Sequence, residues 1–226
     1  MNTKAKLSSD ERRAAIIKAV RGVFATKGFD GTKTRDLADA AGVSEALLFK
    51  HFPNKEALFQ AVQVSCYDGQ YDQELDYLMG LEPSASTLIM MVHVLISYIV
   101  RGTLSGDSEM ATYNRLMLRS LAEDGEFAWH MLQRPAENWV PKCEACLQAA
   151  VADGDAVEGL VFPALRGWFA YQLAAMIRTH LQPERPAVDY GVRPEVLVEQ
   201  AVRFILRGMG LKDEAIKKHY NPKSKS

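Results

Sequence analysis

The segment from Gly28 to Leu58, GFDGTKTRDLADAAGVSEALLFKHFPNKEAL, constrains the fold of this chain more than any other part of it. Its apolar residues recur at helical spacing, and Gly42 stands where a left-handed residue would end one helix. Ser44 follows as an N-cap for a second helix, and Pro53 stops that helix before Asn54 caps another. The segment therefore predicts two short helices joined by a tight turn and followed directly by a third helix.

The same pattern predicts which residues form a core. Thr32 or Thr34 is expected to cap the first short helix. Leu48 and Phe52 stand four residues apart and are expected to be buried on one face of the second. A preceding amphipathic helix, over residues 9–27, would complete a three-helix unit.

A unit of this kind has one well-attested use, which is to place its second helix in the major groove of DNA. With Leu48 and Phe52 buried, the outward face of helix 44–52 comprises Glu45, Ala46, Leu47, Phe49, Lys50 and His51. Lys55 stands where its amine and the N-terminus of the third helix could both meet a phosphate. The sequence thus predicts a DNA-binding unit in about the first 60 residues.

The pieces GFDGT, TRDLADAAGVS and LLFKHFPNKEAL closely resemble the N-terminal domain of the TetR/AcrR family of bacterial transcriptional regulators. The resemblance implies an all-α chain, with a helix-turn-helix DNA-binding domain at 1–60 and a larger helical ligand-binding and dimerisation domain at 61–226. Two positions depart from the family pattern. Leu47 replaces a common small hydroxyl residue and Phe49 a common tyrosine, so each removes one possible hydrogen bond to DNA.

The predicted DNA contacts fall into two groups. The residues assigned to positioning on the DNA backbone are Thr32, Lys33, Arg35, Ser44 and Lys55. The residues assigned to base contact are Glu45, Ala46, Leu47, Lys50 and His51, and Thr34 and Phe49 complete the candidate set. Base reading is expected to depend on Lys50, His51 and apolar contact, for example with a thymine methyl group.

The charge distribution agrees with this assignment. The whole chain of 226 residues carries a net charge of -1. Residues 1–60 contain eleven Lys and Arg against seven Asp and Glu, whereas the remainder contains sixteen against twenty-one. The basic excess therefore lies where phosphates would be met.

The rest of the chain shows helical periodicity throughout. A long helix is expected from Lys55 to about Leu78, shared by the two domains and able to carry motion between them. Further helices are expected over residues 86–103, 107–122, 127–133, 138–152, 157–181 and 194–208. The lysine-rich stretch 212–226 is expected to fray at its end.

The two last long helices are candidates for a dimer interface, because small residues let helices approach closely. The candidate interface residues are Gly167, Ala170, Tyr171, Ala174, Val198, Ala201, Val202 and Ile205. The family resemblance implies that two such helices from each subunit form a four-helix contact. The alternative is that these residues form core faces of a single subunit.

The middle helices supply candidate residues for a ligand pocket, since methionines and aromatics can line an adaptable apolar cavity. These candidates are His93, Tyr98, Tyr113, Met117, Trp129, Trp168, Phe169, Gln172 and Met176. Ordinary core packing is the alternative for each. An effector, largely apolar and not identified by the sequence, is implied mainly by the family.

No targeting or membrane signal is found, and the protein is expected to be cytoplasmic. The longest apolar run, 88–100, is shorter than the roughly 20 residues of a membrane span. Three cysteines, an odd number, favour reduced thiols. Cys143 and Cys146 form one CxxC in helical surroundings without a second pair, so neither a metal nor a cofactor is predicted.

No common catalytic motif is present, so the protein is not predicted to be an enzyme. The function predicted is that of a homodimeric repressor released from its operator by a small molecule. Two alternatives stay open: a DNA-binding factor without a ligand, and a small-molecule-binding protein that has lost DNA binding.

Overall fold

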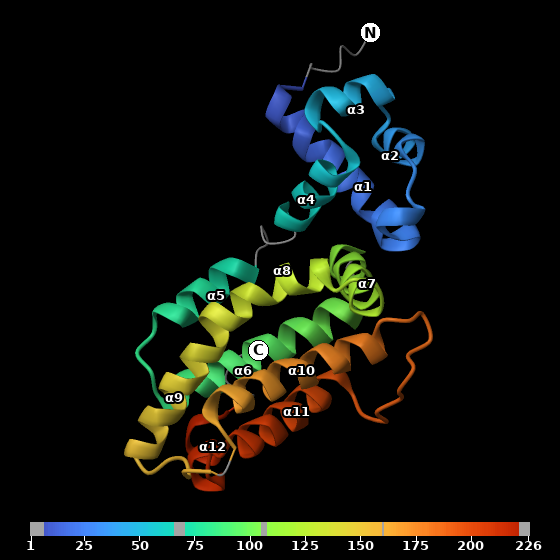
Figure 1. The fold of residues 1–226 in the computed structure, drawn as a ribbon. Helices are drawn as coiled ribbons and strands as arrows, with labels where there is room; N and C mark the ends of the chain where they lie inside the picture. The colour runs from blue at the N-terminus through green and yellow to red at the C-terminus, as the bar shows by residue number, and fades with distance from the viewer. Residues whose placement is uncertain (1–6, 66–70, 105–107, 160, 222–226) are drawn as a thin grey trace. The chain divides into compact units, whose positions relative to one another are not determined.

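The computed structural model describes residues 7–65, 71–104, 108–159 and 161–221, and in these ranges the chain is all-α, as predicted (Figure 1). The N-terminal helices are α1 (Ser9–Gly31), α2 (Thr34–Ala41), α3 (Glu45–His51) and α4 (Lys55–Ser65). The next helices are α5 (Tyr71–Gly80), α6 (Ala85–Leu104), α7 (Ser108–Ala122) and α8 (Glu126–Arg134). A π-helical turn, η1 (Pro135–Trp139), leads into α9 (Val140–Ala152), and α10 (Pro163–Leu181), α11 (Pro194–Met209) and α12 (Asp213–His219) complete the chain.

The helices form two compact units. The first combines Met1–Gly69 with Thr112–Met131, and the second combines Gln70–Ala111 with Leu132–Ser226. The predicted boundary after residue 60 differs from this division, because it assigns Thr112–Met131 to the second domain. That segment groups with the first unit since the buried Phe127 packs near Phe59, with ring centroids 6.4 Å apart. The functional boundary itself stays a prediction.

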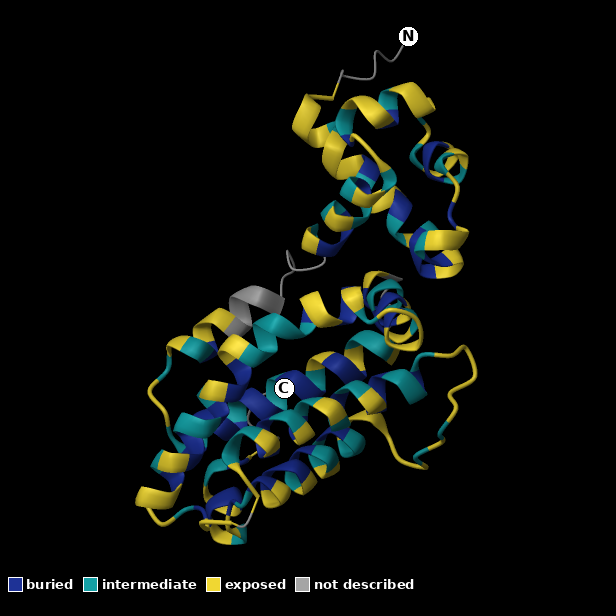
Figure 2. Ribbon diagram, in the orientation of Figure 1, coloured by how far each residue is buried: buried dark blue, intermediate teal, exposed yellow. Residues whose placement is uncertain are grey.

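Helices α1 to α4 share an apolar core, seen as buried positions in Figure 2. The buried residues include Ile16, Val20, Phe24, Leu37, Leu48, Phe52, Leu58 and Val62. The predicted burial of Leu48 and Phe52 is therefore confirmed. Since burying one large apolar side chain contributes about 1.5–3 kcal/mol, this small core can hold three short helices in a fixed arrangement.

Helix α1 is interrupted near its end. Gly28 has φ 72° and ψ 177°, a conformation outside the helical region that side chains rarely adopt. The Thr32 hydroxyl donates to the Gly28 carbonyl, and the Thr32 N–H donates to the Phe29 carbonyl over 3.2 Å. These bonds fold the end of α1 into the turn that leads to α2.

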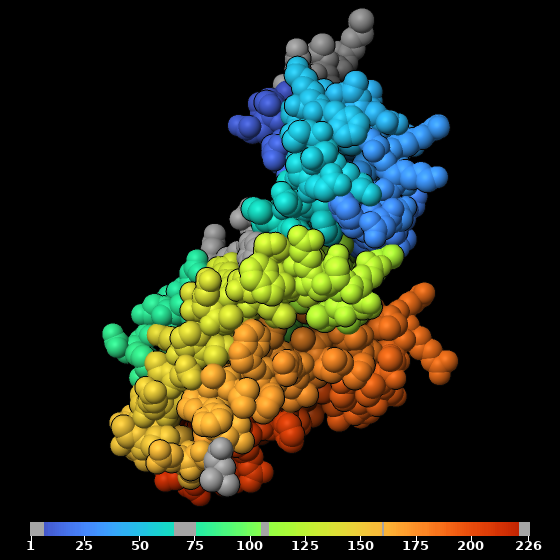
Figure 3. All heavy atoms as spheres, viewed as in Figure 1, coloured from blue at the N-terminus to red at the C-terminus, as the bar shows by residue number. Residues whose placement is uncertain are grey.

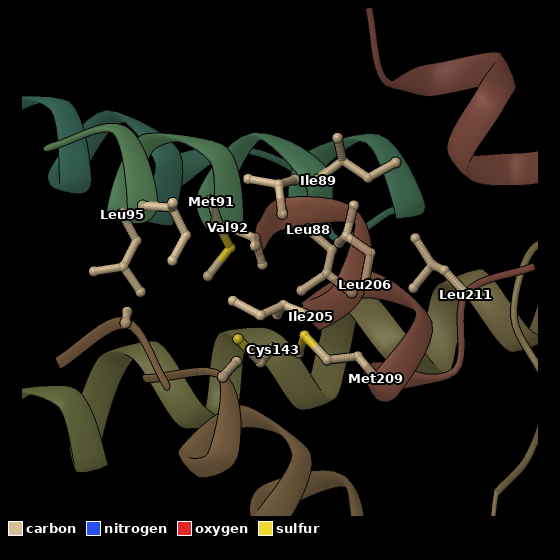
Figure 4. Close-up of a cluster of buried hydrophobic side chains, with 14 of the residues drawn as sticks. Leu88, Ile89, Met91, Val92, Leu95, Cys143, Ile205, Leu206, Met209 and Leu211 are labelled. Carbon is tan, nitrogen blue, oxygen red and sulfur yellow. The ribbon is translucent and has the colours of Figure 1, made fainter. Parts of the chain in front are cut away.

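Helix α6 forms the centre of the second unit and packs against α9, α10, α11 and α12. In the close-up of Figure 4, Met91 and Val92 from α6 lie in the same cluster as Ile205 and Leu206 from α11 and Cys143 from α9. Helix α6 has the length and composition of a membrane-crossing helix, but half of its most apolar window is buried inside the protein. Its role as a core helix accounts for that composition.

Several helices end on cationic side chains that come from other helices. Arg21 Nη2 donates to the Ser65 carbonyl at the end of α4, over 2.8 Å. Lys142 Nζ donates to the Met79 carbonyl at the end of α5 over 2.9 Å, and Arg166 Nη1 donates to the Met209 carbonyl at the end of α11 over 2.9 Å. Because the last carbonyls of a helix lack partners and carry partial negative charge, these cations satisfy and stabilise the helix ends.

One predicted helix begins later than expected, and two other predictions fall partly outside the described residues. The helix expected over 157–181 begins at Pro163, whose fixed φ suits the first helical position. The tail expected to fray at its end forms α12 before residues 222–226, which lie outside the described residues. The expected rod from Lys55 to Leu78 contains residues 66–70, including Cys66, that also lie outside the described residues, so its continuity stays a prediction.

Candidate nucleic-acid interface

The turn before α3 is built as the sequence predicted. Gly42 is left-handed, with φ 63°, and the Val43 N–H donates to the Ala38 carbonyl over 3.0 Å, which closes α2. The Ser44 hydroxyl accepts from the Leu47 N–H over 3.2 Å and caps α3. Both ends of the turn are therefore fixed by backbone geometry and hydrogen bonds.

Arg13 holds the other end of α3, a contact that the sequence pattern does not predict. Its Nη1 donates to the His51 carbonyl over 2.6 Å, and its guanidinium carbon lies 4.2 Å from the centre of the Phe52 ring. A charge-assisted bond at the C-terminus of a helix only seven residues long fixes its last turn. No local signal could have identified this contact, because Arg13 precedes its partner by 38 residues.

The outer face of α3 is open to solvent. Glu45, Ala46, Phe49 and Lys50 are exposed, and Leu47 and His51 are partly buried. The residues assigned to base contact thus lie on the part of α3 that a DNA groove could receive, and their contacts with DNA stay predictions. One acidic, one basic and one large aromatic side chain give this face mixed chemistry, so it is not simply a basic surface.

The start of α2 differs from the prediction in its cap. Neither Thr32 nor Thr34 caps it; Lys33 occupies the N-cap position, and its N–H donates to the Asp36 carboxylate over 3.0 Å. Lys27 Nζ lies 2.7 Å from the same carboxylate. The Lys27 ammonium and then the Lys33 N–H hold the pKa of Asp36 below its ordinary value, because both favour the charged form.

Three assignments at this end of α2 concern the DNA backbone, and Thr34 is a further candidate contact. Thr32 is corrected: it is only 2% exposed and its hydroxyl is bonded to Gly28, so it is not available to a phosphate. Lys33 is exposed, Thr34 is partly buried, and Arg35 is exposed with its Nε 3.8 Å from the Asp39 carboxylate. Lys33 and Arg35 are the exposed cations among these residues.

Lys55 makes internal contacts that the sequence pattern does not predict. Its Nζ donates to the Phe29 carbonyl over 2.9 Å and to the Thr32 carbonyl over 3.3 Å, and it lies 4.2 Å from the centre of the Phe29 ring. The amine is therefore engaged in holding the α1–α2 turn against the start of α4. Its assignment as a phosphate contact stays a prediction, while Asn54 caps α4 as predicted by accepting from the Ala57 N–H over 2.7 Å.

The candidate pocket residues divide between the two units, and their role as one pocket stays a prediction. Tyr113, Met117 and Trp129 belong to the first unit, whereas the other six candidates belong to the second. On α10, Phe169, Gln172 and Met176 are exposed and Trp168 is partly buried. Tyr98 and Trp129 are also exposed, so neither lines an enclosed cavity. The physical reason is that helical spacing identifies one face but does not show whether that face points inward.

His93 is partly buried in the second unit. Its Nδ1 lies 3.1 Å from the Tyr220 hydroxyl, and the Ser97 hydroxyl lies 3.4 Å from its Nε2. Burial raises the pKa of Tyr220 to about 12 and thereby keeps its hydroxyl protonated. Among the candidate pocket residues, His93 thus makes polar contacts within this unit.

The candidate dimer residues on α10 and α11 are corrected as well. Six of them, Gly167, Ala170, Ala174, Val198, Val202 and Ile205, are buried in the core of the single chain, and Tyr171 and Ala201 are partly buried. Small residues on α10 serve close packing within the subunit: a Cβ at Gly167 would lie 3.4 Å from Cys143 Cβ on α9. The alternative reading, core faces of one subunit, holds for the six buried positions, whereas Tyr171 and Ala201 stay candidates for an interface.

The opposite faces of the same two helices carry the exposed apolar side chains. We call them the outer apolar residues: Leu165, Phe169 and Met176 on α10 and Phe204 on α11. Phe169 is 55% exposed and Phe204 is 70% exposed. Helix α10 lies uncovered on the face of the second unit seen in Figure 3.

Cys143 and Cys146 are both buried free thiols on α9. Burial raises the pKa of each thiol and disfavours the thiolate that metal binding or redox exchange would use. Among the described residues, no group of three or more His, Cys, Asp or Glu side chains is placed to hold a metal ion.

The sequence of this chain is similar to known proteins over part of its length. The family model described as "Bacterial regulatory proteins, tetR family" matches residues 16–62. The nucleoid occlusion factor SlmA of Alteromonas mediterranea is 27% identical over 114 residues, which make up 48% of this chain and 58% of that protein. The HTH-type transcriptional repressor KstR2 of Mycolicibacterium smegmatis is 35% identical over 68 residues, or 29% of this chain and 33% of that protein. The matched part thus spans less than two thirds of these relatives.

Solved structures extend the likeness in fold to most of the chain. A bacterial regulatory protein in the tetR family from Rhodococcus RHA1 superposes with a TM-score of 0.63 at 17% identity, covering 90% of this chain and 99% of that one. AibR in complex with isovaleryl coenzyme A and operator DNA superposes with a TM-score of 0.64 at 19% identity, covering 86% of this chain and 97% of that one. At this identity the comparison shows a shared all-α fold in both units.

Proposed function

Because this chain belongs to the tetR family of bacterial regulatory proteins, we propose that it is a homodimeric repressor that releases its operator when a small molecule binds the second unit. The observation that carries the proposal is the outer face of α3, which is capped at Ser44, held at its end by Arg13 and open at Glu45 to Lys50. This is the geometry of a recognition helix.

A second copy of the chain is the expected partner of the outer apolar residues. Leu165, Phe169, Gln172 and Met176 follow one another at steps of four, three and four, so they form a single stripe along α10. Large exposed apolar side chains on neighbouring helices favour a protein partner. A two-fold contact through α10 and α11 would present two copies of α3 to two half-sites, which a helix of seven residues needs for useful specificity.

The proposal assigns the effector to the second unit. AibR, whose fold is similar, was crystallised with an acyl coenzyme A and with operator DNA, which supports a ligand for this fold without naming one for this chain. Release requires that the ligand prefer the state that does not bind DNA, by about 3–5 kcal/mol for an effective switch. Such a regulator would act in the cytoplasm, where the DNA is.

The test begins with the full chain and a pool of random duplexes, from which bound DNA is selected and sequenced. Lys50→Ala should lose preference for the selected duplex, whereas Lys217→Ala, which removes an exposed cation on α12, should not. A compound library is then screened for release of that duplex. Failure to select any duplex would overturn the proposal, and a duplex that no compound releases would favour a factor that senses no ligand.

A further inference from the structure

Arg119, on the last turn of α7, reaches the interrupted end of α1. Its Nη1 donates to the Thr26 carbonyl over 3.0 Å, and its Nε lies 2.9 Å from the Glu123 carboxylate one turn later. All three residues belong to the first compact unit. The guanidinium therefore bonds a backbone carbonyl in the turn of α1 that precedes the Gly28 interruption.

The contact with Gly28 is closer than a side chain there would allow. A Cβ at Gly28 would lie 2.3 Å from Arg119 Nε and 2.6 Å from its Cζ. Gly28 also has positive φ, a conformation that favours glycine, and any side chain there would displace the arginine packed against it. The Arg119 guanidinium occupies the space that any other residue 28 would fill.

The turn that Arg119 holds is the junction of three helices. After Gly28 the chain turns at Thr32, whose hydroxyl bonds the Gly28 carbonyl, and enters α2. Lys55, at the start of α4, bonds the carbonyls of Phe29 and Thr32. Since α2 leads through the Gly42 turn into α3, the direction in which α3 is presented depends on this junction.

Helix α7 belongs to both compact units, because the division falls between Ala111 and Thr112. In the second unit, Gln182 Nε2 donates to the Ala111 carbonyl over 2.8 Å, at the end of α10. In the first unit, the same helix carries Arg119.

We propose that Arg119 is a positioning residue for DNA recognition: it sets the α1–α2 junction and, through that junction, the direction in which α3 is presented. The inference rests on the proposed function, since it concerns how α3 is presented to DNA. It assigns no direct DNA contact to Arg119. The guanidinium acts through the backbone of Thr26 and Gly28.

The first test compares the full chain with Arg119→Ala on the duplex selected by the wild-type protein and on a scrambled duplex. We expect about a tenfold loss of affinity for the selected duplex and no change for the scrambled one, within the range of typical coupling effects. Arg115→Ala is the matched control, because Arg115 is exposed one turn earlier on the same helix. A loss that is equal for both duplexes would indicate less folded protein and would overturn the proposal.

The salt dependence of binding distinguishes positioning from direct contact. Arg119→Ala should leave the slope of log affinity against log salt unchanged, whereas loss of a phosphate contact would reduce it by about 0.9. A reduced slope would overturn the proposal. Gly28→Ala should also weaken specific binding, and the double variant should lose no more than Gly28→Ala alone, because both changes break one contact.

Two further measurements keep the test decisive. If Arg119→Ala does not fold, Arg119→Lys, which keeps the charge but lacks the planar group against Gly28, should retain the melting temperature and lose about threefold in specific affinity. Wild-type affinity in Arg119→Lys would overturn the proposal. Amide hydrogen exchange without DNA should rise in residues 26–36 for the Arg119 variant and not for Arg115→Ala. This readout decides the positioning role even if the chain selects no DNA and the proposed function fails.

Discussion

Helices α3 and α10 both expose a face to solvent, and the two faces differ in chemistry. The outer face of α3 combines Glu45 and Lys50 with one aromatic ring, whereas that of α10 carries Leu165, Phe169 and Met176. A charged face is stable in water and can bind and release a polyanion as salt or geometry changes. A row of large apolar side chains is stable only when it is covered. The first surface is therefore suited to reversible contact and the second to a lasting one.

Helix ends in both units are held in two ways. Local caps act within one turn, as at Ser44 in the first unit and Gly210 in the second. Cations from other helices hold further ends, namely Arg13 and Arg21 in the first unit and Lys142 and Arg166 in the second. Local caps act as soon as a helix forms, whereas these cations act only after the helices have packed.

The largest expected effect is on the apolar face. Phe169→Glu should place a carboxylate from each subunit in the proposed contact, and an unpaired buried charge costs about 3–5 kcal/mol. The dimer should therefore dissociate at concentrations at which the wild-type chain is paired, as measured by sedimentation equilibrium. Arg185→Glu, which adds a carboxylate in the exposed loop after α10, is the control and should stay dimeric. A dimeric Phe169→Glu would place the interface elsewhere.

Substitutions at two neighbouring residues on α11 distinguish a core position from a proposed interface position. Ile205 is 4% exposed and Phe204 is 70% exposed. Ile205→Ala should lower the free energy of unfolding by about 2–5 kcal/mol, because it opens a cavity beside α6. Phe204→Ala should weaken dimerisation and change subunit stability by about 0.5 kcal/mol or less. Urea unfolding at several protein concentrations separates the two effects, and similar behaviour of both variants would contradict the assignment of faces.

On the charged face, Lys50→Ala should cost about 1–3 kcal/mol of binding free energy at one base position, if Lys50 makes a good base contact. The loss should be confined to the selected duplex and its close variants. Titrations against duplexes altered at single positions measure it. A uniform loss across all duplexes would instead assign Lys50 to the phosphate backbone.

Two lysines in the same unit should differ in their salt dependence. Lys33 is exposed, whereas the amine of Lys55 bonds the Phe29 and Thr32 carbonyls. Lys33→Ala should reduce the slope of log affinity against log salt by about 0.9, and Lys55→Ala should lower the melting temperature with little change in slope. The reverse result would assign the phosphate contact to Lys55.

The smallest effect concerns pH. The Lys27 ammonium and the Lys33 N–H lower the pKa of Asp36 from its ordinary value of 3.8. The resulting stabilisation is fully present above pH 3.8 and is lost as the pH falls through the lowered pKa. Asp36→Asn should therefore melt slightly below the wild type at pH 7 and at the same temperature in acid below that pKa. A difference that persists in acid would assign the effect to shape and not to charge.

The sequence predicts the features that depend on local contacts and does not predict those that depend on contacts between distant residues. The α2–α3 turn could be predicted because Gly42 and Ser44 act within a few residues of themselves. The inward face of α10 could not, since Ala174 and Phe169 both fit a helical stripe and only the packing of α9 and α6 decides which one is buried. Arg13, Arg119 and Lys142 could not be predicted either, because their partners are carbonyl groups that every residue has.

The position of α6 in the chain has a consequence for biosynthesis. Residues 85–104 leave the ribosome before α9, α10 and α11, the helices that cover them, have been made. During that interval the nascent chain carries an apolar helix of membrane-spanning length without its partners. The half-made second unit is therefore the form most exposed to aggregation or to capture by chaperones and membrane-targeting factors, and rapid completion of α11 is what protects it.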